Sequence, residues 1–141
     1  MHDTEIFHAS SVALGGRGLL ILGASGSGKS SLALHLMALG ATLVADDRTI
    51  ASGVSNGDVL LAAPEAIRGR MEARGVGILS AAIEQDVPLA LVVDLDRSET
   101  ERLPPDRTIS VLGRDFPLLH NPGTLHFPHA ILQYLKAGRS D

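Results

Sequence analysis

The sequence predicts a single α/β domain with a mixed central sheet that is flanked by helices and β-hairpins. Three observations lead to this class. The chain has 141 residues, enough for one hydrophobic core and too few for two. Hydrophobic residues make up 45% of it and are mostly aliphatic, as is typical of helices packed on a sheet. Short apolar runs alternate with helical patterns and glycine turns. Because no Pro-, Gly- or Ser-rich linker divides the chain, we expect one domain over residues 1–141.

The first third of the chain predicts two strands and a helix. Residues 6–14 and 19–22 have the apolar pattern of strands, and the glycines between them predict a hairpin. Residues 30–39 predict a helix that buries Leu32, Leu36 and Leu39 and stops at Gly40.

The rest of the chain continues the alternation of strands and helices. Asn56-Gly57 is a strong hairpin signal between residues 49–51 and 59–62. Residues 64–72 can open as a short helix, after which Gly75 and Gly77 predict an irregular, mobile stretch. The further expected elements are strands over 42–45, 89–95 and 108–112 and a terminal helix over 127–137.

A phosphate-binding loop (P-loop) is predicted between the strand at 19–22 and the helix that follows. The pattern G-x-x-x-x-G-K-[ST] is met by Gly23, Gly28, Lys29 and Ser30. Its backbone N–H groups would surround a β-phosphate, Lys29 would bridge the β- and γ-phosphates, and Ser30 would ligate Mg²⁺. A Gly/Ser turn before a helix is the alternative, but the flanking buried strand and Leu-rich helix favour a site for Mg²⁺ and ATP. The expected phosphate-binding residues are Gly23, Ala24, Ser25, Gly26, Ser27, Gly28, Lys29 and Ser30.

An acidic pair, Asp46 and Asp47, ends the strand at 42–45 and follows Lys29 by 17 and 18 residues. If this strand is the parallel neighbour of the strand at 19–22, its carboxyl end lies beside the P-loop. One carboxylate could then support a metal and the other could accept a proton as a general base. The alternative is a solvated Asp-Asp turn.

Other features exclude classes of function. The N-K-x-D motif of GTPases is absent, and the net charge of −4 without a Lys/Arg cluster disfavours nucleic acid. The absence of cysteine excludes disulfides and thiolate metal sites. No apolar run reaches the ~18 residues of a membrane span, and no secretory signal is visible, so we expect a cytoplasmic protein without a membrane partner.

Three motifs in register resemble one family. The run from His8 through the P-loop to Asp46-Asp47, followed by Glu72-Ala-Arg-Gly-Val-Gly-Ile78, is similar to the catalytic domain of HPr kinase/phosphorylase. Only Ala73 departs from the family signature E-[IV]-R-G-x-G-I. The resemblance covers roughly residues 5–135 and implies a P-loop kinase that phosphorylates a serine of the phosphocarrier HPr with ATP and Mg²⁺. It also implies the reverse reaction, in which inorganic phosphate removes the serine phosphate as pyrophosphate.

The resemblance also implies roles for individual residues. Asp47 would be the catalytic base, while Asp46, Ser30 and Glu72 would lie at the metal. The other implied catalytic residues are Lys29, His8, Arg74 and, on a loose Glu-Arg-Leu match, Arg102. Simpler alternatives stay open: His8 could cap an edge strand, and Glu72 with Arg74 could form a surface helix pair. The acids Asp94, Asp96, Glu99, Glu101 and Asp106 indicate a solvated loop, with Asp94 near the active edge.

Two departures from the family limit what is expected. The family usually carries a further N-terminal domain and a longer C-terminal helix, so the resemblance is to a short form, and a homo-oligomer is only a possibility. The family's late P-G-R-N-type motif is replaced by Asn121-Pro-Gly-Thr124, which predicts weak or no phosphorylase activity. Two alternatives remain: a small-metabolite kinase with Arg68, Arg70 and Arg74 in a lid, or a non-catalytic module that senses ATP.

Overall fold

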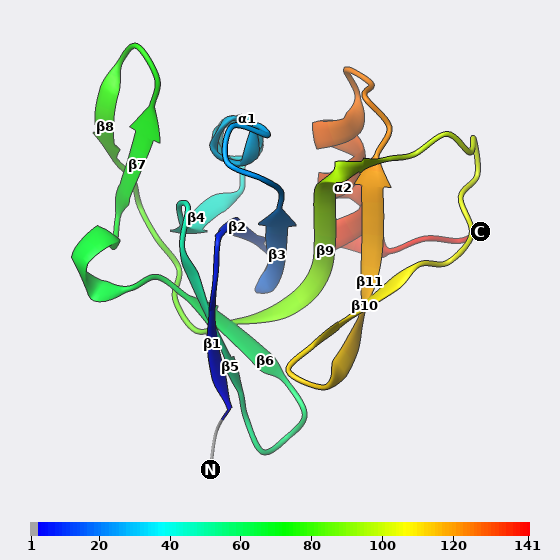
Figure 1. The fold of residues 1–141 in the computed structure, drawn as a ribbon, viewed down its shortest axis with the longest axis horizontal. Coiled ribbons are helices and arrows are strands. Elements are labelled where there is room, and N and C mark those ends of the chain that lie inside the picture. Colours follow the sequence, from blue (N-terminus) through cyan, green and yellow to red (C-terminus); the bar gives the residue numbers. More distant parts are fainter. Residues whose placement is uncertain (1–2) are drawn as a thin grey trace.

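The computed structural model describes residues 3–141, and its elements follow one another as strands with two α-helices inserted. Figure 1 shows them coloured along the chain. They are β1 (Thr4–Phe7), β2 (Ala9–Leu14), β3 (Arg17–Leu22), α1 (Lys29–Ala38), β4 (Thr42–Ala45), β5 (Thr49–Gly53), β6 (Val59–Ala62), the 3₁₀ turn η1 (Glu65–Ile67), β7 (Arg70–Ala73), β8 (Gly77–Ser80), β9 (Val87–Ser98), β10 (Thr108–Val111), β11 (Arg114–Asn121) and α2 (Phe127–Ala137). Among these described residues, neither α1 nor α2 is long and apolar enough to cross a membrane.

A large mixed sheet runs through the molecule in the order β1-β5-β6-β9-β3-β2-β4. Strand β9 is parallel to β3 on one side and to β11 on the other, whereas β2 is antiparallel to both β3 and β4. The carboxyl ends of β3, β4, β9 and β11 therefore meet at one edge of the sheet, toward which the β3 and β11 arrowheads point in Figure 1. This edge carries the site described below.

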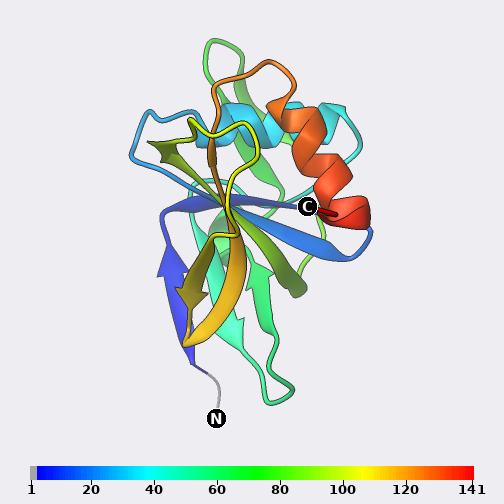
Figure 2. The same ribbon diagram turned by 90° about the vertical axis from the view of Figure 1, so that its right-hand side faces the viewer.

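The sheet separates two hydrophobic clusters. Successive residues of β3 point to opposite faces, so Leu19 and Ile21 join one cluster while Leu20 joins the other. On the first face, α1 and α2 contribute Leu36 and Ile131, both fully buried. On the second face, residues of β5, β6 and β10 complete the other cluster, and Figure 2 shows β5 and β6 extending away from the helices. Burial on both faces explains the continuous apolar run of β3.

Most of the expected elements are present. The hairpins β2–β3 and β5–β6, strands β4, β9 and β10, and helices α1 and α2 lie at or within a few residues of their predicted positions. The mixed sheet with helices and hairpins confirms the predicted fold class.

Several expectations were wrong in detail. The strand predicted over 6–14 is two strands, β1 and β2, separated at His8. Leu39 is exposed because it is the C-cap residue of α1, beyond the part of the helix that the sheet covers. The predicted helix over 64–72 shrinks to η1, and the stretch with Gly75 and Gly77 is the turn and first residue of an ordered hairpin, β7–β8.

A candidate phosphate-binding site

The loop from Gly23 to Gly28 joins the end of β3 to the first turn of α1. Gly26 and Gly28 have φ values of 81° and 100°, a left-handed conformation that glycine adopts without strain. At Gly23 the reason for glycine is space, since a Cβ atom there would collide with the side chain of Ser27. A hydrogen bond from Ser27 N to Ala24 O (2.9 Å) closes the turn. Ser25, Gly26 and Gly28 of the loop and the N-terminus of α1 line one concave surface, an arrangement that suits an anion.

Lys29 lies folded across this loop. Its side chain is buried, and its Nζ donates hydrogen bonds to Gly23 O (2.8 Å) and Ala24 O (3.1 Å). The two carbonyl groups solvate the ammonium charge. The same charge lines the pocket in front of the loop, where it could attract a phosphate group.

Asp46 is the centre of a hydrogen-bond network at the end of β4. Its Oδ1 accepts hydrogen bonds from Ser30 Oγ (2.6 Å) and Ser10 Oγ (3.0 Å), and its Oδ2 accepts one from the backbone N–H of Glu72 (3.1 Å). The residue is only 8% exposed. Asp46 thus ties the P-loop helix, strand β2 and the β7–β8 hairpin together at one point.

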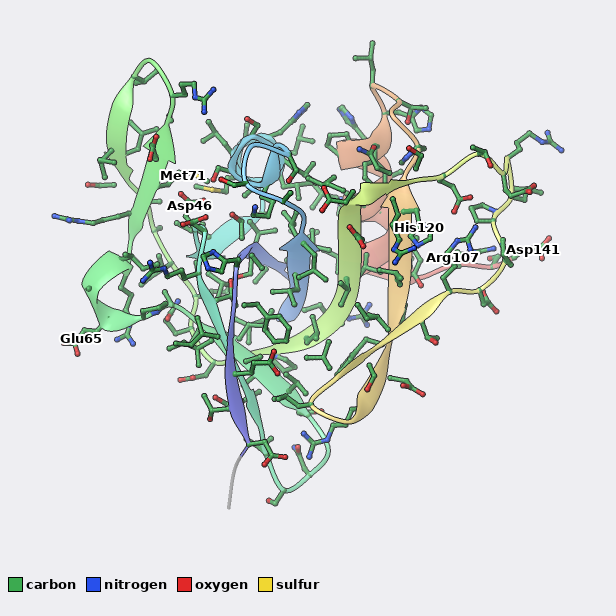
Figure 3. The ribbon with its side chains drawn as sticks, viewed as in Figure 1. Asp46, Glu65, Met71, Arg107, His120 and Asp141 are labelled. Atoms are coloured by element: carbon green, nitrogen blue, oxygen red, sulfur yellow. The ribbon has the colours of Figure 1, made fainter. Side chains whose placement is uncertain are left out.

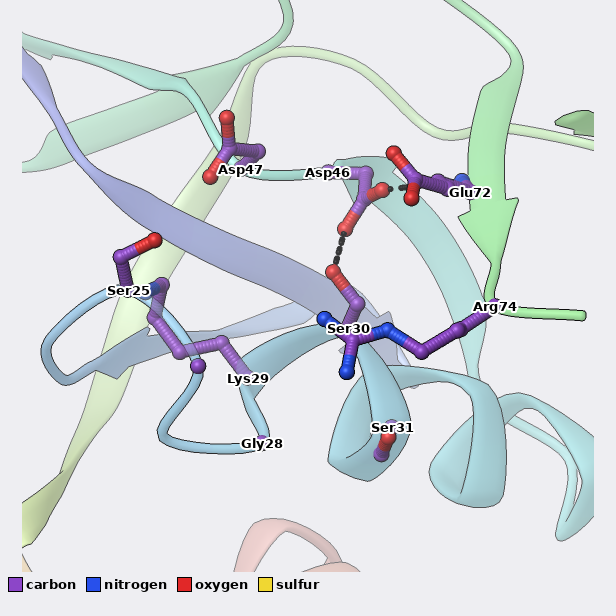
Figure 4. Close-up of a pocket in the computed structure, with 10 residues that line it drawn as sticks. Ser25, Gly28, Lys29, Ser30, Ser31, Asp46, Asp47, Glu72 and Arg74 are labelled. Carbon is purple, nitrogen blue, oxygen red and sulfur yellow. Dashed lines mark hydrogen bonds between the residues drawn. The ribbon is translucent and has the colours of Figure 1, made fainter.

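Asp47 adopts an unusual conformation next to it. Its φ is 67°, a left-handed value that is uncommon outside glycine and that Asp tolerates better than most residues. Its backbone N–H donates to Ser10 Oγ (3.1 Å), while its carboxylate is exposed and accepts no hydrogen bond from residues 3–141. Figure 4 shows its carboxylate directed away from that of Asp46. The carboxylate is therefore free to act on a substrate.

The β7–β8 hairpin brings Glu72 and Arg74 to the same place. Met71, fully buried beside Asp46 in the view of Figure 3, anchors the hairpin in the first hydrophobic cluster. The outcome is a pocket of about 440 Å³ between the P-loop and the hairpin (Figure 4). It is lined by Ser25, Gly26, Gly28, Lys29, Ser30, Ser31, Asp46, Asp47, Glu72 and Arg74.

The route by which the acidic pair reaches the pocket differs from the expected one. Strand β4 is not the neighbour of β3, because β2 lies between them and is antiparallel to both. The two reversals leave β4 pointing the same way as β3, so Asp46 still arrives at the P-loop edge. The alternative in which Glu72 and Arg74 share a surface helix is wrong, since Glu72 belongs to β7 and Arg74 to the hairpin turn.

Five predicted residues are not among those that line the pocket: Gly23, Ala24 and Ser27, which belong to the loop itself, and His8 and Arg102. His8 lies at the bend between β1 and β2, and the pairing of Ala9 with Leu22 places it at the P-loop edge of the sheet. Arg102 is exposed in the connection between β9 and β10. Its neighbours Leu103 and Asp106 line a separate hollow with Arg139 near the C-terminus.

Sequence reasoning missed Ser31, which lines the pocket, and two further residues that support the site. Ser10 is fully buried in β2 and joins Asp46 to the backbone of Asp47. A serine pair inside an otherwise apolar strand was the signal that could have found it. Asp96, expected in a solvated loop, instead accepts a hydrogen bond from Ala24 N (2.8 Å) at the extended end of β9.

The residues of the pocket fit Mg²⁺ and the phosphates of a nucleotide. Among residues 3–141 no group of three His, Asp or Glu side chains surrounds a common metal position. Mg²⁺ commonly binds through one or two carboxylates, water and substrate phosphates, and Ser30, Asp46 and Glu72 offer oxygen ligands of that kind. Within the described chain, the Oγ atom of Ser27 is buried without a hydrogen-bond partner, and a phosphate oxygen could supply one.

The fold and the site define a class: α/β proteins that hold a P-loop between a buried strand and a helix, with paired carboxylates at the same sheet edge. Comparison with known proteins identifies one family within this class. The model of the HPr Serine kinase C-terminal domain matches residues 1–113, and the chain belongs to this family.

Individual relatives agree with this family. The chain is 35% identical over 132 residues to an HPr kinase/phosphorylase of Prosthecochloris aestuarii, and 38% identical over 127 residues to one of Caldicellulosiruptor bescii. These alignments cover 83% and 82% of the chain but 39% and 41% of the relatives. The chain thus spans about two fifths of their length. A solved structure of the Hpr(Ser) kinase/phosphatase from Coxiella burnetii has the same fold, with a TM-score of 0.76, 24% identity and coverage of 94% of this chain and 88% of that one.

Proposed function

We propose that this chain is the catalytic domain of an ATP-dependent protein-serine kinase that phosphorylates the phosphocarrier HPr. One observation carries the proposal: the P-loop residues Lys29 and Ser30 share a pocket with the exposed carboxylate of Asp47. No described residue donates a hydrogen bond to this carboxylate. The names of the relatives support HPr as the acceptor. The reaction would take place in the cytoplasm, and a homo-oligomer stays a prediction.

On the nucleotide side, each P-loop residue would have a distinct task. The loop N–H groups bind the β-phosphate, and Lys29 exchanges its two carbonyl partners for the β- and γ-phosphate oxygens. Ser30, Asp46 and Glu72 would hold Mg²⁺, which neutralises charge on the phosphates when it is bound. Arg74 lines the same pocket and would stabilise negative charge on the transferring group. His8 at the sheet edge and Arg102 stay predictions as further catalytic residues.

On the acceptor side, Asp47 would act as the general base. The serine oxygen of HPr attacks the γ-phosphorus, the bond between this phosphorus and the β,γ-bridging oxygen breaks, and ADP leaves. The serine proton passes to the Asp47 carboxylate. Because Asp46 is engaged in three hydrogen bonds, Asp47 is the better placed of the two acids to receive a proton.

A second hollow adjoins the pocket and would receive the acceptor protein. It shares Asp46, Asp47 and Glu72 with the first pocket and is otherwise lined by Arg48, Ile67, Arg70, Met71 and Ile78. Ile78 is 63% exposed and so offers apolar contact area beside the polar pocket. A protein surface with apolar residues beside its serine would fit here better than a small metabolite. Arg68, a lid candidate in the small-metabolite alternative, is instead bonded to Ala63 O.

The kinase proposal is tested with γ-labelled ATP, Mg²⁺ and purified HPr. We expect label on a serine of HPr, located by mass spectrometry, and less label when Ile78 is replaced by Asp. Label transferred only to small metabolites would favour a metabolite kinase. Binding of ATP without any transfer would favour a sensing module.

The reverse reaction is proposed to be weak or absent, because Asn121-Pro-Gly-Thr124 lacks the arginine of the family motif. Phosphoserine-HPr and inorganic phosphate are mixed with the protein, and pyrophosphate is measured. Release at a rate comparable to that of the kinase reaction would overturn this part of the proposal.

A further inference from the structure

The peptide groups around Ala24 hold the P-loop in shape. The Ala24 carbonyl accepts hydrogen bonds from Ser27 N (2.9 Å) and from Lys29 Nζ (3.1 Å). The Ala24 N–H is also engaged, because it donates to Asp96 Oδ2 (2.8 Å). The position of Ala24 therefore sets both the turn of the loop and the resting position of the Lys29 ammonium.

Asp96 is itself held by its surroundings. Its backbone N–H donates to Asp94 Oδ1 (2.9 Å), and Asp94 is paired in register with Leu22, the last residue of β3. On the other side of β9, Asn121 accepts a hydrogen bond from Glu99 N (2.8 Å) through its carbonyl. The end of β9 is thus fixed between β3 and β11, which makes it a firm support for the loop.

The negative charge of Asp96 should weaken the binding of a polyphosphate at the P-loop, because like charges repel one another. The contact with the P-loop requires only that Oδ2 accept one hydrogen bond from the Ala24 N–H. An uncharged acceptor of the same shape would serve equally well.

We propose that Asp96 is a positioning residue that acts through Ala24 to hold the turn of the P-loop in the phosphate-binding conformation. It touches neither the reacting atoms nor the nucleotide. The inference rests on the proposed function in one respect: it assumes that the P-loop binds ATP.

The test compares Asp96→Ala, which removes the acceptor, with Asp96→Asn, which keeps it without the charge. The control is Asp115→Ala, an exposed aspartate at the start of β11, whose pairing with Ser110 puts it at the end of the strand opposite the loop. We measure ATP dissociation constants by calorimetry and amide hydrogen exchange at Ser27. We expect Asp96→Ala to weaken ATP binding about tenfold and to accelerate exchange, because the Ala24 N–H loses its side-chain acceptor. Asp96→Asn should bind ATP as tightly as the wild type or slightly more tightly, and Asp115→Ala should match the wild type.

Equal weakening by Asp96→Asn and Asp96→Ala would overturn the proposal, because it would make the charge essential, as for a metal ligand or a base. Unchanged exchange at Ser27 in Asp96→Ala would overturn it as well. If the wild-type protein did not bind ATP, the proposed function would fail, whereas the exchange measurement, which needs no nucleotide, would still decide the role of Asp96.

Discussion

Two neighbouring aspartates at the end of β4 differ in almost every physical respect. Asp46 is 8% exposed and accepts hydrogen bonds from Ser30, Ser10 and the backbone of Glu72. Asp47 is exposed and has a left-handed backbone conformation. The first residue therefore contributes to the stability of the fold, and the second carries backbone strain at a position suited to chemistry.

This contrast predicts opposite effects on stability. Asp46→Ala leaves the hydroxyls of Ser10 and Ser30 without an acceptor and should lower the free energy of unfolding by about 2–3 kcal/mol. Asp47→Gly removes the left-handed strain and should raise it by up to about 1 kcal/mol, while abolishing phosphoryl transfer. Urea denaturation of both variants measures the two values. A larger loss of stability in Asp47→Gly than in Asp46→Ala would contradict these roles.

At the scale of elements, an ion pair fixes the connection between β9 and β10. Arg107 Nε and Nη2 donate to Glu99 Oε1 (3.0 Å) and Oε2 (3.1 Å), and the Glu99 side chain is 6% exposed. In Figure 3, Arg107 and His120 lie beside β11, across the width of the molecule from Asp46. The hydrogen bond from Arg107 is the main cause that lowers the pKa of Glu99, and the same bond raises the pKa of Arg107.

The direction of the Glu99 shift predicts how stability depends on pH. A carboxyl group whose pKa is lowered by folding stabilises the protein above its ordinary value of 4.5. This contribution is lost as the pH falls from that value through the lowered pKa. Glu99→Gln should therefore have a lower Tm than the wild type at pH 7, and the gap should shrink below pH 4.5. The control is Glu65→Gln, an exposed residue of η1 that takes no part in this ion pair. A Tm difference that stays constant below pH 4.5 would show that the Glu99 carboxylate does not stabilise the fold in this way.

The elements that the sequence predicts well are those with a local signal. The P-loop, α2 and the Asn56-Gly57 hairpin depend on glycine geometry, helical periodicity and turn type, which are properties of neighbouring residues. Strand β11 was missed because Pro117 and Asp115 interrupt its apolar pattern, and its pairing with β9 is distant in the chain. Strand β7 was mistaken for helix because Pro64 opens a single 3₁₀ turn and the burial of Met71 is a tertiary effect.

In the site, too, the sequence predicts the residues that belong to local motifs and misses those that depend on tertiary contacts. Lys29, Ser30, Asp46 and Asp47, predicted from motifs and their spacing, line one pocket together with Glu72, which the family resemblance implied. Ser10 and Asp96 could not be foreseen, because each acts through a partner that the sheet topology brings close.

At the scale of the whole molecule, the central sheet connects the two hydrophobic clusters. Strands β3, β2 and β9 contribute side chains to both hydrophobic clusters, so neither cluster can be lost without the other. This arrangement predicts a single cooperative unfolding transition, as for other small domains. The chain has one tyrosine and no tryptophan, so fluorescence reports on Tyr134 in α2, while far-UV circular dichroism reports on all helices and strands together. The two midpoints in urea should coincide. Separate midpoints would show that α2 unfolds independently.

The central claim is that the pocket transfers a phosphoryl group with Asp47 as base. The most direct measurement compares the wild type with Asp47→Asn for label transfer from ATP to HPr and for ATP affinity in the same preparation. We expect transfer to fall by about 10²–10⁴-fold, the usual contribution of a general base, with the ATP dissociation constant within about twofold. Transfer by Asp47→Asn at the wild-type rate would contradict the claim.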